Sequence, residues 1–191
     1  MIDVLRAAAG IFATFAPFAL IPAFLAIPRR EGGEGRHETV GLAVGVALGA
    51  LAVVVLLTDL FLGALDVAPE SFQGAAAVIM LPLAARLLWS GRALDPGEHV
   101  TSRPWLTPLA VPGLVGPGSM AAVIAYTGRY GELDAAAAIV LALGVTAGTL
   151  VGGELVTRRL GDVALNIIGR LSGAFIVVIA LELAVVGVKS V

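Results

Sequence analysis

The chain has 191 residues, of which 59% are hydrophobic and 14% charged, with no cysteine and a formal net charge of −2. A soluble domain carries roughly 45–50% apolar and about 25% charged residues, so this composition excludes an ordinary soluble protein. The hydrophobicity excludes intrinsic disorder, the lack of a basic excess argues against nucleic acid, and the absence of cysteine excludes disulfides and Cys-ligated metals. The composition predicts a polytopic membrane protein of one domain.

A helix needs about 20 mostly apolar residues to cross the hydrocarbon core of a bilayer. The sequence contains six such segments, at residues 7–28, 39–58, 69–91, 104–128, 135–153 and 163–188. The third contains Arg86, and the sixth contains Arg170 and Glu182. We therefore predict an all-α fold with six transmembrane helices.

The basic residues predict the orientation of these helices. The connections 1–2, 3–4 and 5–6, counted with their flanking helix ends, hold nine of the 12 basic residues: Arg29, Arg30, Arg36, Arg86, Arg92, Arg103, Arg158, Arg159 and Arg170. The opposite side holds Arg6, Arg129 and Lys189. The positive-inside rule then places the first set in the cytoplasm and both chain termini outside, in a multi-pass protein of the plasma membrane or bacterial inner membrane.

The two halves of the sequence resemble each other. A shift of 95 residues lays Pro17 on Pro112, Pro22 on Pro117 and Asp59 on Glu154. Because each half holds three spans, the second half inserts upside down, which gives the 3+3 inverted repeat typical of secondary transporters. The predicted boundaries are 1–92 for the first repeat, 93–103 for the linker and 104–191 for the second repeat.

Glycines recur every four residues in the second span of each half. The two sets are Gly41, Gly45 and Gly49, and Gly144, Gly148 and Gly152. Glycines at this spacing line one helix face and let another backbone approach closely. We interpret them as packing seams, either between the repeats or between copies of the chain in a homo-oligomer.

The first and fourth spans contain closely spaced prolines, which remove backbone donors and break helices. Interrupted helices at matching positions of two halves indicate the binding site of a transporter, although simple proline kinks are the alternative interpretation. Unwound backbone offers N–H groups to a carboxylate and carbonyl groups to an ammonium. The expected substrate-binding residues are Ala16, Pro17, Pro22, Pro112, Gly116, Pro117, Gly118 and Ser119.

The segment 108–119, Pro-Leu-Ala-Val-Pro-Gly-Leu-Val-Gly-Pro-Gly-Ser, resembles the Pro-Leu-Ala-Ile-Pro-x-x-x-Gly-Pro-Gly signature of the MarC family of membrane proteins. The family's first span reads Asn-Pro-x-Gly-x-x-Pro-x-Phe, and here the asparagine and glycine are replaced by Ala16 and Ala19. Gly74, Arg170 and Gly173 also match the family's pattern. The resemblance implies six spans and, for some members, proton-coupled transport of small neutral amino acids.

A charged side chain inside a bilayer costs roughly 3 kcal/mol and is a functional hypothesis by default. Glu182 lies about 9 Å inside the outer end of the sixth span, without a nearby basic residue in sequence to neutralise it. It is either a proton acceptor of a transport cycle or a structural contact. Asp59 near the outer end of its span is explained by solvation and Glu154 by pairing with Arg158, or the two are gates at opposite ends of one path. Arg86 and Arg170 lie near the cytoplasmic ends of their spans and are expected to reach lipid phosphates.

The leading hypothesis is a secondary transporter of a small polar solute, expected to be a neutral amino acid moved with protons. The alternatives are a membrane protein that only oligomerises and a lipid-processing protein. We expect no enzyme, no cofactor and no metal, because the sequence contains no recognisable catalytic triad, phosphate-binding loop or ligand cluster.

Overall fold

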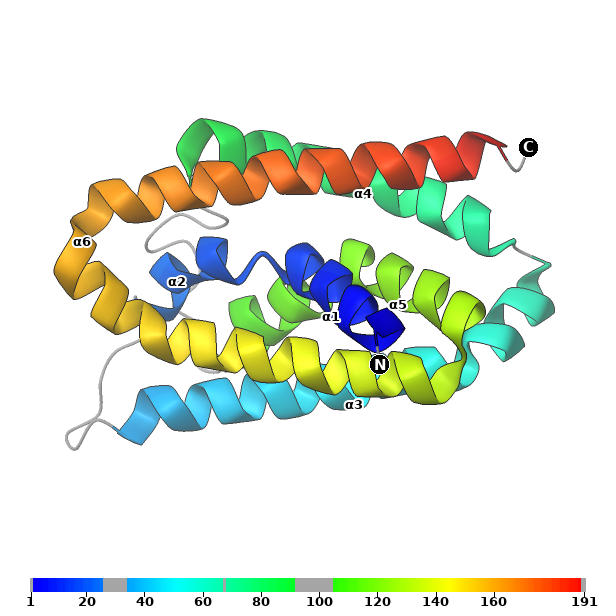
Figure 1. Ribbon diagram of the computed structural model, residues 1–191, viewed down its shortest axis with the longest axis horizontal. Coiled ribbons are helices and arrows are strands. Elements are labelled where there is room, and N and C mark those ends of the chain that lie inside the picture. Colours follow the sequence, from blue (N-terminus) through cyan, green and yellow to red (C-terminus); the bar gives the residue numbers. More distant parts are fainter. Residues whose placement is uncertain (1, 26–33, 67, 92–104, 190–191) are drawn as a thin grey trace.

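The fold is entirely helical in the part of the chain that the structure, a computed structural model, describes: residues 2–25, 34–66, 68–91 and 105–189. In chain order the helices are α1 (Ile2–Phe15), α2 (Pro17–Leu25), α3 (Glu34–Leu65), α4 (Pro69–Ser90), the π-helix η1 (Trp105–Leu114), α5 (Pro117–Tyr130) and α6 (Glu132–Lys189) (Figure 1). Since the described ranges contain no strand, the expected all-α class is confirmed. The predicted linker 93–103 lies outside the described residues.

Helical segments long and apolar enough to cross a membrane are found at His37–Thr58, Glu70–Ser90, Glu132–Gly153 and Asn166–Lys189. These four coincide with the second, third, fifth and sixth predicted spans. The first and fourth predicted spans are each divided into two shorter helices, α1 with α2 and η1 with α5. Neither helix of such a pair reaches the length of about 20 residues that a crossing requires.

Helix α6 consists of two limbs that meet at Gly161. The backbone of Gly161 has φ 71° and ψ 177°, which is not helical, and here the chain turns back on itself (Figure 1). A positive φ of this size is readily adopted by glycine, which has no Cβ. We call residues 132–160 the N-terminal limb and residues 162–189 the C-terminal limb.

The helices form two layers around the broken pairs. Figure 1 shows α4 beside the C-terminal limb at one edge and α3 beside the N-terminal limb at the other, with α1, α2, η1 and α5 between them. One core of buried side chains joins α1, α2, α3, η1, α5 and the N-terminal limb, around Ile11, Phe15, Leu51 and Leu114. A smaller core joins α4 and the C-terminal limb to the starts of α2 and α5.

Glycines bring α4 and the C-terminal limb into backbone contact at both ends of their antiparallel crossing. A Cβ added to Gly187 would lie 2.6 Å from the Cα of Gly74, and a Cβ added to Gly169 would overlap the carbonyl group of Gly91. Beside this second contact, the side-chain amide of Asn166 donates a hydrogen bond of 2.9 Å to the carbonyl oxygen of Ser90. These contacts allow no larger side chain, so they fix the packing distance of the two helices.

The two predicted glycine stripes lie elsewhere. A Cβ added to any of the six glycines would meet no atom of the described chain within 4 Å; they are Gly41, Gly45, Gly49, Gly144, Gly148 and Gly152. The expectation that they pack the two halves against each other is therefore wrong, because both stripes point away from the core. Contact between copies of the chain stays a prediction.

This difference predicts opposite results for two matched glycine substitutions. Gly169→Ala forces a methyl group into the Gly91 backbone, and overpacking of this kind typically costs about 1–3 kcal/mol. Gly148→Ala meets open space and gains helix propensity of about 1 kcal/mol. In thermal unfolding of the detergent-solubilised protein, followed by tryptophan fluorescence, we expect a lower Tm for the first variant only. An equal loss of Tm in both variants would contradict the assignment of Gly169, and not Gly148, to a close backbone contact.

Candidate functional site

The first helix is interrupted at Ala16, which separates α1 from α2. Its φ of 44° lies in the left-handed region, and the following Pro17 has no amide hydrogen to donate to α1. The break is spanned by two short hydrogen-bonded turns: the Ala16 amide donates to the Ala13 carbonyl (3.2 Å), and the Ala19 amide donates to the Ala16 carbonyl (2.9 Å). The chain thus restarts as a new helix with Pro17 at its first position, where proline is tolerated.

The fourth predicted span is interrupted at Val115 and Gly116. The π-helix η1 ends at Leu114, and its last turn is closed by the Val115 amide donating to the Ala110 carbonyl (2.8 Å). Helix α5 then starts at Pro117, with Gly116 as its N-cap. The Ser119 hydroxyl ties this start together, because it accepts from the Gly116 amide and donates to the Gly116 carbonyl, both at 2.9 Å.

The two breaks are not spaced as the sequence alignment predicts. Helices α2 and α5 begin at Pro17 and Pro117, which are 117 − 17 = 100 residues apart, whereas the prolines align at a shift of 95. Pro112, the sequence partner of Pro17, lies inside η1 instead of at the break. A π-helix holds more residues per turn than an α-helix, so η1 absorbs additional residues before the chain breaks.

A cavity of about 250 Å³ lies between the two breaks. Its lining residues come from both broken pairs and from α4 and α6: Thr14, Phe15, Ala16, Ala19, Leu20, Ile79, Met80, Leu83, Leu87, Gly113, Gly116, Pro117, Gly118, Ser119 and Ile176. Of the expected substrate-binding residues, Ala16, Gly116, Pro117, Gly118 and Ser119 therefore share one cavity. Pro17 starts α2 without lining it, and the side chains of Pro22 and Pro112 lie outside the described residues.

The cavity is almost entirely apolar, and its few polar groups belong to Thr14, Ser119 and the main chain at the two helix starts. Helix α4 supplies large apolar side chains, and the helix starts supply main chain with few side-chain atoms in front of it. Helices α2 and α5 both begin at the breaks, and a helix N-terminus carries a positive partial charge with free N–H groups. The Thr14 hydroxyl donates to the Ile11 carbonyl at 2.7 Å. The site is thus suited to a small, largely apolar ligand, with the two helix starts as its polar features.

The α4 wall was not predicted from the sequence. A Cβ added to Gly118 would lie 2.6 Å from the Met80 sulfur, so Met80 closes directly over the start of α5. In the sequence, Ile79, Met80 and Leu83 are apolar residues of an ordinary apolar helix, and no motif separates them from lipid-facing neighbours. The Gly-Pro-Gly segment 116–118 is the one feature of the sequence that indicates such a neighbour. Its glycines leave space that a side chain from another helix has to fill.

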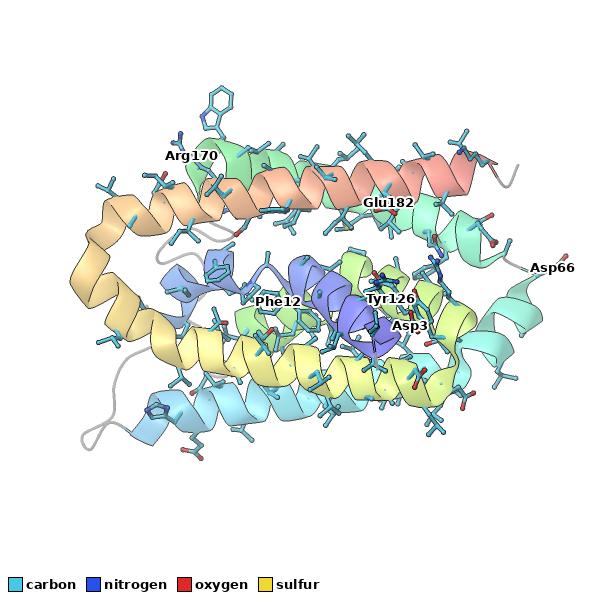
Figure 2. All side chains as sticks on the ribbon, in the orientation of Figure 1. Asp3, Phe12, Asp66, Tyr126, Arg170 and Glu182 are labelled. Atoms are coloured by element: carbon cyan, nitrogen blue, oxygen red, sulfur yellow. The ribbon has the colours of Figure 1, made fainter. Side chains whose placement is uncertain are left out.

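Glu182, the acidic residue expected to couple transport to protons, does not line the cavity. Glu182 is exposed on the C-terminal limb of α6, on the side toward α5 and Tyr126 (Figure 2). Its carboxylate lies close enough to act electrostatically on the Tyr126 hydroxyl. Asp59 and Glu154 belong to α3 and α6, but their side chains lie outside the described residues.

The fold and the cavity define a class: an integral membrane protein of apolar helices, two of them broken around an internal cavity. The sequence comparisons give the family. Residues 2–191 match the family described as MarC family integral membrane protein, and the chain belongs to this family. This confirms the resemblance drawn from the segment 108–119.

Relatives from both bacteria and archaea match almost the full chain. A UPF0056 membrane protein of Methanocaldococcus jannaschii is 24% identical over 94% of this chain and 93% of its own. In Escherichia coli K12, the UPF0056 inner membrane protein YhgN is 23% identical over 99% of this chain and 98% of its own. The UPF0056 membrane protein YhcE of the same strain is also 23% identical, over 95% and 90%. No solved structure matches the chain at a significant level.

Ala16 stands where the family resemblance implies asparagine. The positive φ of Ala16 gives a physical reason why asparagine is favoured at this position. Asparagine and glycine tolerate positive φ, whereas other residues pay roughly 1–2 kcal/mol for it. We therefore predict that Ala16→Asn and Ala16→Gly raise the Tm of the detergent-solubilised protein and that Ala16→Val lowers it. Ala19→Gly, in the right-handed backbone of α2, is the matched control and lowers it through backbone entropy. A loss of stability in Ala16→Gly would contradict the left-handed assignment.

Proposed function

We propose that this protein is a secondary transporter of a small zwitterionic solute of the neutral amino acid class, driven by protons, and that it has no enzymatic activity. The observation that carries the proposal is the cavity formed where two helices are broken, lined by Ala16 from one break and Gly116 to Ser119 from the other. Broken helices whose N-termini meet at a central site are how secondary transporters bind charged solutes without burying charged side chains.

An inverted repeat of three plus three spans accounts for several separate contacts. In this arrangement α1 with α2, and η1 with α5, each make one crossing, which together with the four long segments gives six. The contact of Gly74 with Gly187 then has a counterpart in that of Gly169 with Gly91, since 169 − 74 = 95 and 187 − 91 = 96. The same repeat, with the distribution of arginine, places both termini outside the cell.

Each part of a neutral amino acid has a matching surface in the cavity. The carboxylate binds at the starts of α2 and α5, where the helix N-termini offer backbone N–H groups, and the Ser119 hydroxyl holds the start of α5 in place through its two hydrogen bonds to Gly116. The ammonium group binds to carbonyl oxygens at the end of α1, where Pro17 cannot supply a hydrogen-bond donor. The side chain packs against Met80, Leu83 and Ile176, which favours small aliphatic groups.

Glu182 is our choice for the proton-coupling group. It lies seven residues before the end of the segment Asn166–Lys189, and a carboxylate at that depth in a membrane segment marks an ion or proton pathway by default. Its action on Tyr126 connects it to α5, the helix that starts at the cavity.

One observation favours a lipid-like ligand as the second candidate. Ile79 and Leu83 line the cavity and are also 60% and 41% exposed, near the middle of the segment Glu70–Ser90. At that depth the exposed surface faces hydrocarbon, so the cavity wall is one side chain thick toward the bilayer. A ligand with an acyl chain would enter there, in a lipid-processing or lipid-transporting protein.

The transport proposal is tested by uptake of small neutral amino acids into proteoliposomes, with and without an inward proton gradient. We expect saturable uptake that depends on the gradient in the wild type and is independent of it in Glu182→Gln. Ser119→Ala should raise KM about tenfold, which corresponds to about 1.4 kcal/mol of binding free energy. Ser172→Ala is the matched control, because Ser172 is a buried serine of α6 whose hydroxyl donates to the Ile168 carbonyl (3.0 Å), away from the cavity.

Two outcomes would contradict the proposal. No uptake of any amino acid by folded wild-type protein would reject the substrate class, and displacement of a fluorescent fatty acid from the same protein would then support the lipid-like ligand. Equal effects of Ser119→Ala and Ser172→Ala on KM would show that the cavity does not take part in transport.

A further inference from the structure

The cavity-lining faces of α1 and α5 continue beyond the cavity toward the end of the molecule that holds the chain termini. Thr14 lines the cavity, and Gly10 lies one helical turn before it on the same face of α1. Ser119 lines the cavity, and Tyr126 lies two turns after it on the same face of α5. Along these two faces, the way from the cavity to this end leads past Gly10 and Tyr126.

These two faces are in contact. A Cβ added to Gly10 would overlap the Tyr126 hydroxyl and lie 2.9 Å from the ring carbon Cζ, so the tyrosine ring is seated on the bare backbone of α1. Between this contact and the cavity lies Val123, which is fully buried in the same core as Ile11 and Phe15. The path is therefore closed by one large side chain above one apolar layer.

Tyr126 stands at the border between the buried core and the exposed surface. Its ring stacks on that of Tyr130, with 6.0 Å between centroids and 16° between planes, and the Arg129 guanidinium lies 5.4 Å from the Tyr130 ring centroid. Figure 2 shows Glu182 on the facing side of α6, and its carboxylate acts on the Tyr126 hydroxyl. Polar and charged groups thus surround Tyr126 on its outer side, with apolar groups below it.

We propose that Tyr126 is the gate of the cavity on the side of the chain termini and that its seat on Gly10 is the closed position. The inference rests on the proposed transport function for its meaning, but the barrier itself is a property of the structure. Because the seat is a glycine, the ring lies deep against α1, and a rotation of this side chain removes the outer part of the barrier while α1 and α5 stay in place. Side-chain rotations are fast compared with helix movements, so Tyr126 controls access to the apolar layer around Val123 that separates it from the cavity.

The absence of cysteine from the chain allows a direct test. Ser119→Cys places one thiol in the cavity, where the serine is only 2% exposed. We measure its reaction with a charged, membrane-impermeant thiol reagent, applied from the side of the chain termini. The rate should rise at least tenfold when Tyr126→Ala is added and stay unchanged when Tyr126→Phe is added, because phenylalanine keeps the ring. Tyr130→Ala, which removes the stacked neighbour but not the ring on Gly10, is the matched control.

The side of application is set by a reference thiol. Leu133→Cys lies 87% exposed at the same end of the molecule, at the start of α6, and we use intact cells or inside-out vesicles according to which preparation labels it. Gly10→Ala is an independent second variant, since its methyl group displaces the ring, and it should raise the rate in the same direction. Gel filtration of each variant identifies any that fail to fold.

Two results would overturn the gate. One is a folded Tyr126→Ala variant, together with a folded Gly10→Ala variant, whose cavity thiol reacts no faster than in Ser119→Cys alone. The other is an equal rise with Tyr130→Ala, which would show a general loosening of this end. Neither result depends on transport. If the thiol assay supports the gate but the protein takes up no amino acid, the proposed substrate is rejected and the gate is retained.

Discussion

The structure depends on one constraint: backbone polar groups inside a bilayer need partners, and proline has no amide hydrogen to offer. In hydrocarbon each unsatisfied backbone group costs several kcal/mol, so a broken helix persists only where protein or a cavity receives the freed groups. Pro17 and Pro117 start new helices after such breaks, and both breaks lie at one cavity. The Ser119 hydroxyl and the short turns at Ala16 satisfy part of the freed backbone. The helix starts that remain are the polar part of an otherwise apolar cavity.

Two pairs of helices around the cavity are packed in different ways. Helix α4 and the C-terminal limb of α6 are held at backbone distance by the contacts of Gly74 with Gly187 and Gly91 with Gly169, and they carry the apolar wall of the cavity. On the opposite wall, α1 and α5 meet through a tyrosine seated on a glycine. Close packing therefore defines the shape of the site, and toward the chain termini the cavity is covered by the apolar layer around Val123 with Tyr126 above it.

Much of the fold and part of the site were predictable, because prolines, glycines and apolar runs act locally. The apolar runs predicted where α3, α4 and both limbs of α6 lie, and the prolines predicted that the first and fourth spans are broken. Five residues of the expected site, Ala16 and the segment 116–119, line the cavity. The exact partner of Pro17 was not predictable, since the second break lies five residues later than the alignment places it, and only part of this shift is taken up by the wider turns of the π-helix η1.

By itself, the sequence determined that the protein lies in a membrane, that it is helical and which two apolar segments are interrupted, since each of these depends on residues close together in the chain. Only the tertiary structure decided which faces meet. Glycines four residues apart look the same whether they pack or not: those of α3 and the N-terminal limb face outward, while Gly10, Gly74 and Gly169 make the contacts. The position of Met80 over the start of α5 and that of Tyr126 against Gly10 likewise depend on which helix faces meet. The rotation of each helix about its axis is set by distant partners, and no local pattern records it.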